Sequence, residues 1–167
     1  MNKIEGVVVG IVKSRDDPQS LGRLLVVFPW LPGDNQSFWA RIATLMSGGG
    51  RGTWFMPEID DEVLVAFEHG DPNHPYIVGF LWNGQDKPPI TDPKRRLIHS
   101  VNGHEIELRD PDVVQGDTGG IRIQDAQGNV VELSNASIRI QSVGTLQITA
   151  PNVIINNRVV APTPRPI

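Results

Sequence analysis

Five short segments rich in apolar residues mark the first half of this chain. The segments are 6–13, 23–28, 38–43, 62–68 and 76–81. Val63, Val65 and Phe67 recur with the period of two that is typical of β-strands, and the proline and glycine between the segments leave little room for a helix. Five short strands joined by glycine-rich turns favour a small closed barrel over an open sheet.

The second half repeats a shorter pattern, in which two apolar residues stand two positions apart. The pairs are Ile121 and Ile123, Val131 and Leu133, Ile138 and Ile140, Leu146 and Ile148, and Val153 and Ile155. Each pair predicts a short strand with one apolar and one polar face. Gly128 and Gly144 lie where tight turns between such strands are expected.

One chain cannot bury these apolar faces by itself. The segment has no aromatic residue and no covering layer, and a meander of such strands would leave its edges unpaired. A one-chain β-solenoid would need more and larger repeats. Three chains whose apolar faces meet on one axis would cover both faces and edges. The pattern therefore predicts an intertwined trimeric β-helix or β-prism shaft, with the ten paired residues as its core.

The distribution of aromatic residues separates the two halves. All ten lie between Phe28 and Trp82, so we expect the compact core in the first half. The stretch 85–93 is rich in Pro and Asp, which indicates a linker. We therefore expect an all-β chain with a barrel over 1–84, a linker over 85–97 and a shaft over 98–167.

Charge, cysteine content and the N-terminus narrow the functional classes. The net charge is −4, whereas nucleic-acid-binding surfaces are usually basic. Residues 97–119 are acidic and residues 120–167 are mildly basic.

The absence of cysteine excludes disulfides and thiolate metal sites and is compatible with assembly in a reducing cytosol. The apolar stretch 7–12 is too short for a signal peptide or a membrane span and predicts a strand.

Three groups of residues resemble sites, and a structural role is favoured for each. The run 47–52, SGGGRG, lacks the ending of a phosphate-binding loop and predicts a mobile connection. The acids in PEIDDE, at 57–62, lie in a turn rather than across a glycosidase cleft, and Asp60 and Asp61 are expected to hold that turn. No GxSxG elbow is present. We therefore expect no enzyme activity.

Histidines near acids form the third group. They are His69, His74, His99 and His104, with Glu68, Asp71, Glu105 and Glu107 nearby. None of the spacings matches a known metal motif, so structural or surface roles are favoured over metal binding. We therefore expect no metal site and no cofactor.

Three blocks of the first half resemble a known family. They are GRLLVVFPWLPG at 22–33, FWARIA at 38–43 and GTWFMPEIDDEVLVAFEHGDPNHPYIVGFLWNGQDKPP at 52–89. In their order and in their Trp, Pro and Gly positions they resemble the OB (oligonucleotide/oligosaccharide-binding) domain of phage baseplate assembly protein V. The same pattern is found in the valine-glycine repeat spike proteins of type VI secretion systems and in extracellular contractile injection systems. The segment 98–110, IHSVNGHEIELRD, resembles the start of the family's shaft.

This resemblance implies the central spike of a contractile machine. Such a spike is a homotrimer attached to a baseplate hub, and sheath contraction drives it through a target envelope that it contacts only transiently. It would belong to a virion tail or injection particle assembled in the bacterial cytoplasm. Because the barrel begins near Met1 and the linker is short, the hub and any lysozyme domain are expected to be separate proteins. The tail 161–167 has no His for an iron-binding apex, so a PAAR-type tip protein is expected there.

A binding protein is the alternative. OB barrels can bind single-stranded nucleic acid or saccharides by stacking them on aromatic side chains. Here the aromatic residues stand in FPW, FW and WF groups beside Pro and Gly, which favours core and turn packing, and the basic residues of the barrel are few and scattered. The spike interpretation predicts essentially no binding of a single-stranded oligonucleotide at physiological salt.

Overall fold

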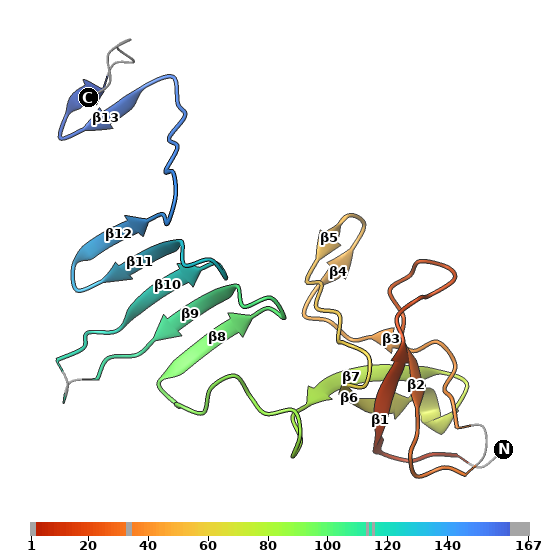
Figure 1. Cartoon of the computed structure of the whole chain (residues 1–167). Coiled ribbons are helices and arrows are strands. Elements are labelled where there is room, and N and C mark those ends of the chain that lie inside the picture. Colours follow the sequence, from red (N-terminus) through yellow and green to blue (C-terminus); the bar gives the residue numbers. More distant parts are fainter. Residues whose placement is uncertain (1–2, 33–34, 113, 115, 161–167) are drawn as a thin grey trace. The chain divides into compact units, whose positions relative to one another are not determined.

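The computed structural model describes residues 3–32, 35–112, 114 and 116–160. Within them the chain is all-β, with one turn of 3-10 helix at Glu68–Gly70, which confirms the predicted class. It divides into two compact units, Met1–Pro88 and Pro89–Ile167 (Figure 1). No helix in the described part is long and apolar enough to cross a membrane. The tail 161–167, where we expect a tip protein, lies outside the described residues.

Five strands of the first unit form the barrel, and each overlaps one of the predicted segments. They are β1 (Val7–Ser14), β2 (Leu25–Val27), β3 (Arg41–Ile42), β6 (Glu62–Phe67) and β7 (Pro75–Leu81). Their order is β2-β1-β6-β7-β3, with β3 parallel to β7 and the other pairs antiparallel. Leu24 and Ala40 exchange two backbone hydrogen bonds of 2.9 and 2.8 Å, which join the two ends of this order and close the barrel.

The barrel core is mostly aliphatic. Its buried residues are Val12, Leu24, Val26, Phe28, Ala40, Val63, Val65, Phe67 and Ile77. The expectation that the aromatic residues pack in the core is wrong for most of them. Six are exposed: Trp30, Phe38, Trp54, Phe55, Phe80 and Trp82. The narrow interior of a small barrel is filled at alternate strand positions, which here carry mainly Val, Leu and Ile.

A short hairpin projects from the barrel where we expected a mobile connection (Figure 1). Its strands are β4 (Ser47–Gly48) and β5 (Arg51–Gly52). Gly52 has φ +147°, and a Cβ there would lie 2.5 Å from the backbone oxygen of Met46. The glycine-rich run therefore allows close backbone approach within a hairpin rather than only flexibility.

A buried carboxylate organises the loop between β1 and β2. The side chain of Asp17 is 2% exposed and accepts hydrogen bonds from the guanidinium of Arg23 at 2.7 and 2.9 Å. It also accepts backbone N–H bonds from Gln19 and Leu21 at 3.1 and 3.0 Å. The Arg23 hydrogen bonds, followed by the backbone N–H groups, hold the pKa of Asp17 far below its usual range.

This low pKa predicts how barrel stability depends on pH. A depressed folded-state pKa contributes stability that is fully present above the ordinary aspartate pKa of about 4 and is lost as the pH falls below it. We expect Asp17→Asn to destabilise the barrel at pH 7, with a difference from the parent that shrinks between about pH 4 and pH 2. Denaturant unfolding followed by tryptophan fluorescence measures this, and a difference that stays constant over this range would contradict it.

Five strands of the second unit form one antiparallel sheet. They are β8 (Arg95–His99), β9 (Glu105–Arg109), β10 (Gly120–Gln124), β11 (Val130–Ser134) and β12 (Ser137–Gln141). They lie in chain order, from β8 at one edge to β12 at the other. A separate hairpin follows, formed by β13 (Val153–Ile155) and β14 (Arg158–Val160). The acidic segment 97–119 and the basic segment that follows it are therefore not separate structures, because both supply strands to the same sheet.

The β11–β12 turn places two L-residues in the left-handed region. Asn135 has φ +46° and Ala136 has φ +59°, between the paired residues Ser134 and Ser137. Asn tolerates this conformation, whereas Ala has no side-chain group to compensate for the steric cost of about 1 kcal/mol or more.

We therefore expect Ala136→Gly to stabilise the second unit. Relief of strain exceeds the added unfolded-state entropy, for a net gain of roughly 0.5–1 kcal/mol. The denaturant midpoint at fixed protein concentration measures this gain. Asn157→Gly is the matched control, because Asn157 has φ +60° in the analogous β13–β14 turn and is expected to gain less. A lowered midpoint for Ala136→Gly would contradict the prediction.

Candidate trimer interface

One face of the β8–β12 sheet is apolar across all five strands. The strand register aligns two rows of neighbouring side chains. The first row is Ile98, Ile106, Ile123, Val131 and Ile140. The second is Arg96, Leu108, Ile121, Leu133 and Ile138. We call these nine apolar residues the apolar sheet face; they continue from edge to edge, with Arg96 as the one charged residue among them.

The apolar sheet face is exposed in the single chain. Ile138 is 73% exposed and Ile140 is 58% exposed, and all nine members except Val131 are at least 40% exposed. The opposite face of the sheet carries charged residues, which are less exposed to solvent: Glu107 is only 3% exposed. We call this the charged face. This pattern of exposure is the reverse of a normal soluble sheet, in which the apolar side faces the core. A contiguous apolar surface of this kind marks a contact with another molecule.

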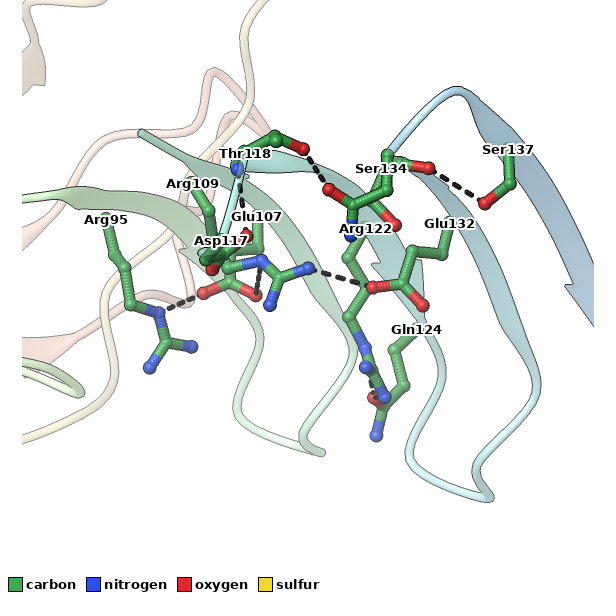
Figure 2. Close-up of polar contacts among 12 residues, drawn as sticks. Arg95, Glu107, Arg109, Asp117, Thr118, Arg122, Gln124, Glu132, Ser134 and Ser137 are labelled. Atoms are coloured by element: carbon green, nitrogen blue, oxygen red, sulfur yellow. Dashed lines mark hydrogen bonds and ion pairs between the residues drawn. The ribbon is translucent and has the colours of Figure 1, made fainter. Parts of the chain in front are cut away.

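The opposite face carries a network of charges centred on Glu107 (Figure 2). The Arg95 guanidinium donates a hydrogen bond to Glu107 Oε1. Arg109 Nη2 donates to Glu132 Oε1 at 2.8 Å, and Arg109 Nε lies 4.0 Å from Glu107 Oε2. Arg109 therefore bridges two carboxylates on β9 and β11, across the strand between them. Because charge-assisted contacts partly compensate for desolvation, this face is held together by polar contacts within one chain.

The charges on this face also alternate in sign from one strand to the next. In one cross-strand row, Glu107, Arg122, Glu132 and Arg139 stand next to one another in register. Opposite charges directly across from each other stabilise a strand pair by roughly 0.2–1 kcal/mol, and like charges destabilise it. A shift of β10, β11 or β12 by two residues would break this alternation, because the residues two positions away on these strands are uncharged. The row therefore favours the observed register.

The β10–β11 turn is fixed by Asp125. Its carboxylate accepts backbone N–H bonds from Gln127 at 3.0 Å and Asn129 at 2.8 Å, and a side-chain bond from Asn129 at 2.6 Å. These bonds, led by the Asn129 side chain, lower the pKa of Asp125. Asn129 Oδ1 in turn accepts the Val143 N–H at 2.9 Å, which ties the segment after β12 to this turn. Gly128 lies in this turn with φ +96°.

The structure brings together six of the ten residues predicted as trimer core. They are Ile121, Ile123, Val131, Leu133, Ile138 and Ile140. Leu146 and Ile148 lie outside any strand of the single chain and are exposed, and Val153 and Ile155 lie in β13. Ile98, Ile106 and Leu108 lie on the same face and are not among the ten predicted core residues. The alternation in 105–109, EIELR, carries the signal that would have found two of them.

The candidate metal and acid clusters have structural contacts. Nδ1 of His74 lies 3.1 Å from Asp71 Oδ2, and Nδ1 of His99 lies 3.1 Å from Glu105 Oε2. The Asp61 carboxylate accepts the Glu58 N–H at 2.8 Å, so it holds the turn before β6. Among the described residues, no three or more His, Asp or Glu side chains are placed to share a metal ion.

Two family models match the chain in succession. Residues 8–82 match the type VI secretion system/phage-baseplate injector OB domain, and residues 96–161 match the phage baseplate V C-terminal trimerisation domain. The chain belongs to the phage baseplate V and VgrG spike family. The predicted OB barrel is thereby confirmed, and the sheet with the exposed apolar face lies within a trimerisation domain of this family.

Several curated proteins are similar to this chain. The type VI secretion system spike protein VgrG1a of Pseudomonas aeruginosa is 33% identical over 126 residues, which cover 73% of this chain and 19% of that protein. The spike protein VgrG3 of Vibrio cholerae is 29% identical over 92 residues, covering 52% and 9% respectively. The actin cross-linking toxin VgrG1 of Vibrio cholerae is 35% identical over 92 residues, covering 52% and 8%. The chain thus spans less than a fifth of the length of these relatives.

Proposed function

We propose that this chain is the structural central spike of a contractile injection machine. One observation carries the proposal: nine apolar side chains cover one face of a sheet in the trimerisation domain, and eight of them are at least 40% exposed in the single chain. Similarity to spike proteins supports the same role. In this proposal the barrel over 1–84 is the attachment module, and the region 98–167 is the needle.

The proposed assembly is a homotrimer in which the three apolar sheet faces meet on one axis. Each Ile, Leu or Val side chain that leaves water contributes about 1.5–3 kcal/mol, and three copies of nine residues make a large, cooperative interface. The interface would extend toward the C-terminus, where three chains intertwine, through Leu146, Ile148, Val153 and Ile155. There the unpaired edge of β12 would pair with a strand from a neighbouring chain.

The charged face would then be the outer surface. Its ion pairs close within one chain, so it offers no apolar patch to the solvent and keeps the needle soluble. A spike of this kind acts through stiffness rather than chemistry. We propose no catalytic role for any residue and no cofactor, because the two matched families are an OB domain and a trimerisation domain.

The proposed partners follow from this role. A separate baseplate hub would hold the barrels, a PAAR-type protein would cap the C-terminal end, and the target envelope would be contacted only during piercing. The chain would be assembled in the bacterial cytoplasm and would not bind nucleic acid.

Purified contractile particles test this function directly. We expect particles from cells that make the chain to contain it in three copies each, counted by quantitative mass spectrometry. Its deletion should leave no particle that can pierce a target. Absence of the chain from the particles, or particles that kill normally without it, would contradict the proposed function.

A further inference from the structure

The barrel has a second unexplained apolar surface, on the outer side of its sheet. Strands β1, β6 and β7 contain the nearly continuous apolar runs VVVGIV, VLVAF and YIVGFL. Runs of this kind are expected where both faces of a sheet are covered. One face packs in the barrel core, through Val12, Val63, Val65 and Ile77. The other face is only partly covered: Val7 and Val9 are exposed, and Leu64 and Ala66 are half-buried.

Register places the outward residues of β1 and β6 side by side. Val7 pairs with Ala66, and Val9 pairs with Leu64. Val7 is 53% exposed and Val9 is 40% exposed. The Trp30 indole, itself 47% exposed, donates a hydrogen bond of 3.2 Å to the backbone oxygen of Val9. We call Val7, Val9, Leu64, Ala66 and Trp30 the outer barrel face.

A groove is lined by the β4–β5 hairpin, the segments that flank it and residues 78–80 of β7. Its volume is about 910 Å³. Its apolar lining includes Leu45, Met46, Trp54, Phe55, Val78 and Phe80. Leu45 is 93% exposed and Trp54 is 71% exposed. Trp, Phe and Met are the residue types enriched in the centres of protein interfaces, and no acidic residue lines this hairpin groove.

We propose that the hairpin groove of one chain receives the outer barrel face of the next chain in the trimer. A ring of three identical bodies is closed by heterologous contacts, so each body needs two different complementary surfaces. In a three-membered ring, both neighbours lie toward the same side of each member. The barrel offers two different apolar surfaces, one on β1 and β6 and one on β7 with the β4–β5 hairpin, as a heterologous contact requires.

Connectivity favours a second copy over an unrelated partner. This inference rests on the proposed homotrimer, because the trimerisation domain would hold three barrels near one another. Only residues 89–94 separate the barrel unit from β8. Six residues span at most roughly 20 Å. Linkers this short give effective concentrations in the millimolar range, at which even a weak apolar contact would form.

Thiol labelling of the full chain tests this contact, because the chain has no native cysteine. We expect Leu45→Cys, in the groove, and Val7→Cys, on the outer barrel face, to react with a maleimide at least about tenfold more slowly than Gln19→Cys when the chain is trimeric. Gln19 is exposed in the β1–β2 loop and outside both surfaces. Adding Ile140→Asp, which should separate the chains, is expected to restore fast labelling at both positions.

The outcomes separate this inference from the proposed function. If light scattering shows a trimer and either thiol reacts as fast as that of Gln19→Cys, the barrels do not pack in this way, while the spike assignment stands. That result would leave the surface for a different protein. If the parent chain is not trimeric, the proposed function and the inference both fail. Slow labelling at both positions in the trimer supports the contact even if the Ile140→Asp background does not fold.

Discussion

Replacement of Ile140 by Asp is expected to abolish the trimer. Ile140 lies on edge strand β12 in the apolar sheet face, beside Val131, and is 58% exposed in the single chain. In the assembled needle three copies of the new carboxylate would be buried near one axis, and buried charges without partners cost several kcal/mol each. Light scattering should therefore report the single-chain mass of 18.4 kDa. Ile148→Asp should act in the same way.

Gln141→Asp is the matched control for this variant. It introduces the same side chain on the same strand one residue away, on the charged face. Because that face would remain in water, we expect the trimer to persist with nearly unchanged stability. If Ile140→Asp also stays trimeric, the apolar sheet face does not point toward the axis, and the assignment of its residues as the interface is wrong.

Replacement of Glu107 by Ala is expected to destabilise the second unit strongly. Glu107 is 3% exposed and lies between Arg95 and Arg109, so its removal leaves Arg95 without its counter-charge and leaves Arg109 with Glu132 alone. Loss of a buried ion-pair partner costs 3–5 kcal/mol, and because both arginines are partly exposed we expect about 2 kcal/mol. Denaturant unfolding at a fixed protomer concentration measures this loss.

The more exposed pair of His99 and Glu105, on the same charged face, supplies the comparison for Glu107. Their side chains are 40% and 23% exposed. Glu105→Ala should therefore change stability by less than about 1 kcal/mol. If the two variants lose equal unfolding free energy, the burial of Glu107 does not determine its contribution to stability, and the charged face has another role.

The barrel was largely predictable because its signals are local. The period of two in 62–67 and the apolar run 76–81, together with the glycine and proline between segments, locate the strands within a few residues. The position of the aromatic side chains was not predictable in this way. Phe28 and Phe67 lie in the core, whereas Trp54 and Phe55 do not, because a narrow interior and a hairpin that projects from the barrel are properties of the closed fold.

The apolar sheet face was predictable only in part for a related reason. The pairs from Ile121 to Ile140 follow the period of two, and the structure aligns them in register. Ile106 and Leu108 follow the same period, but their acidic neighbours mark that segment as charged. The charged network could not be inferred at all, since the contact between Arg109 and Glu132 joins residues 23 positions apart on strands that are not adjacent.

The mass of the full chain in solution tests the central claim most directly. Sedimentation equilibrium at micromolar concentration should show one species of about 55 kDa, three times the 18.4 kDa of a single chain. The apolar sheet face would then be covered, and the trimer should bind little of a hydrophobic dye. A stable, soluble species of 18.4 kDa with low dye binding would show that one chain covers this face by itself, and would contradict the trimeric spike.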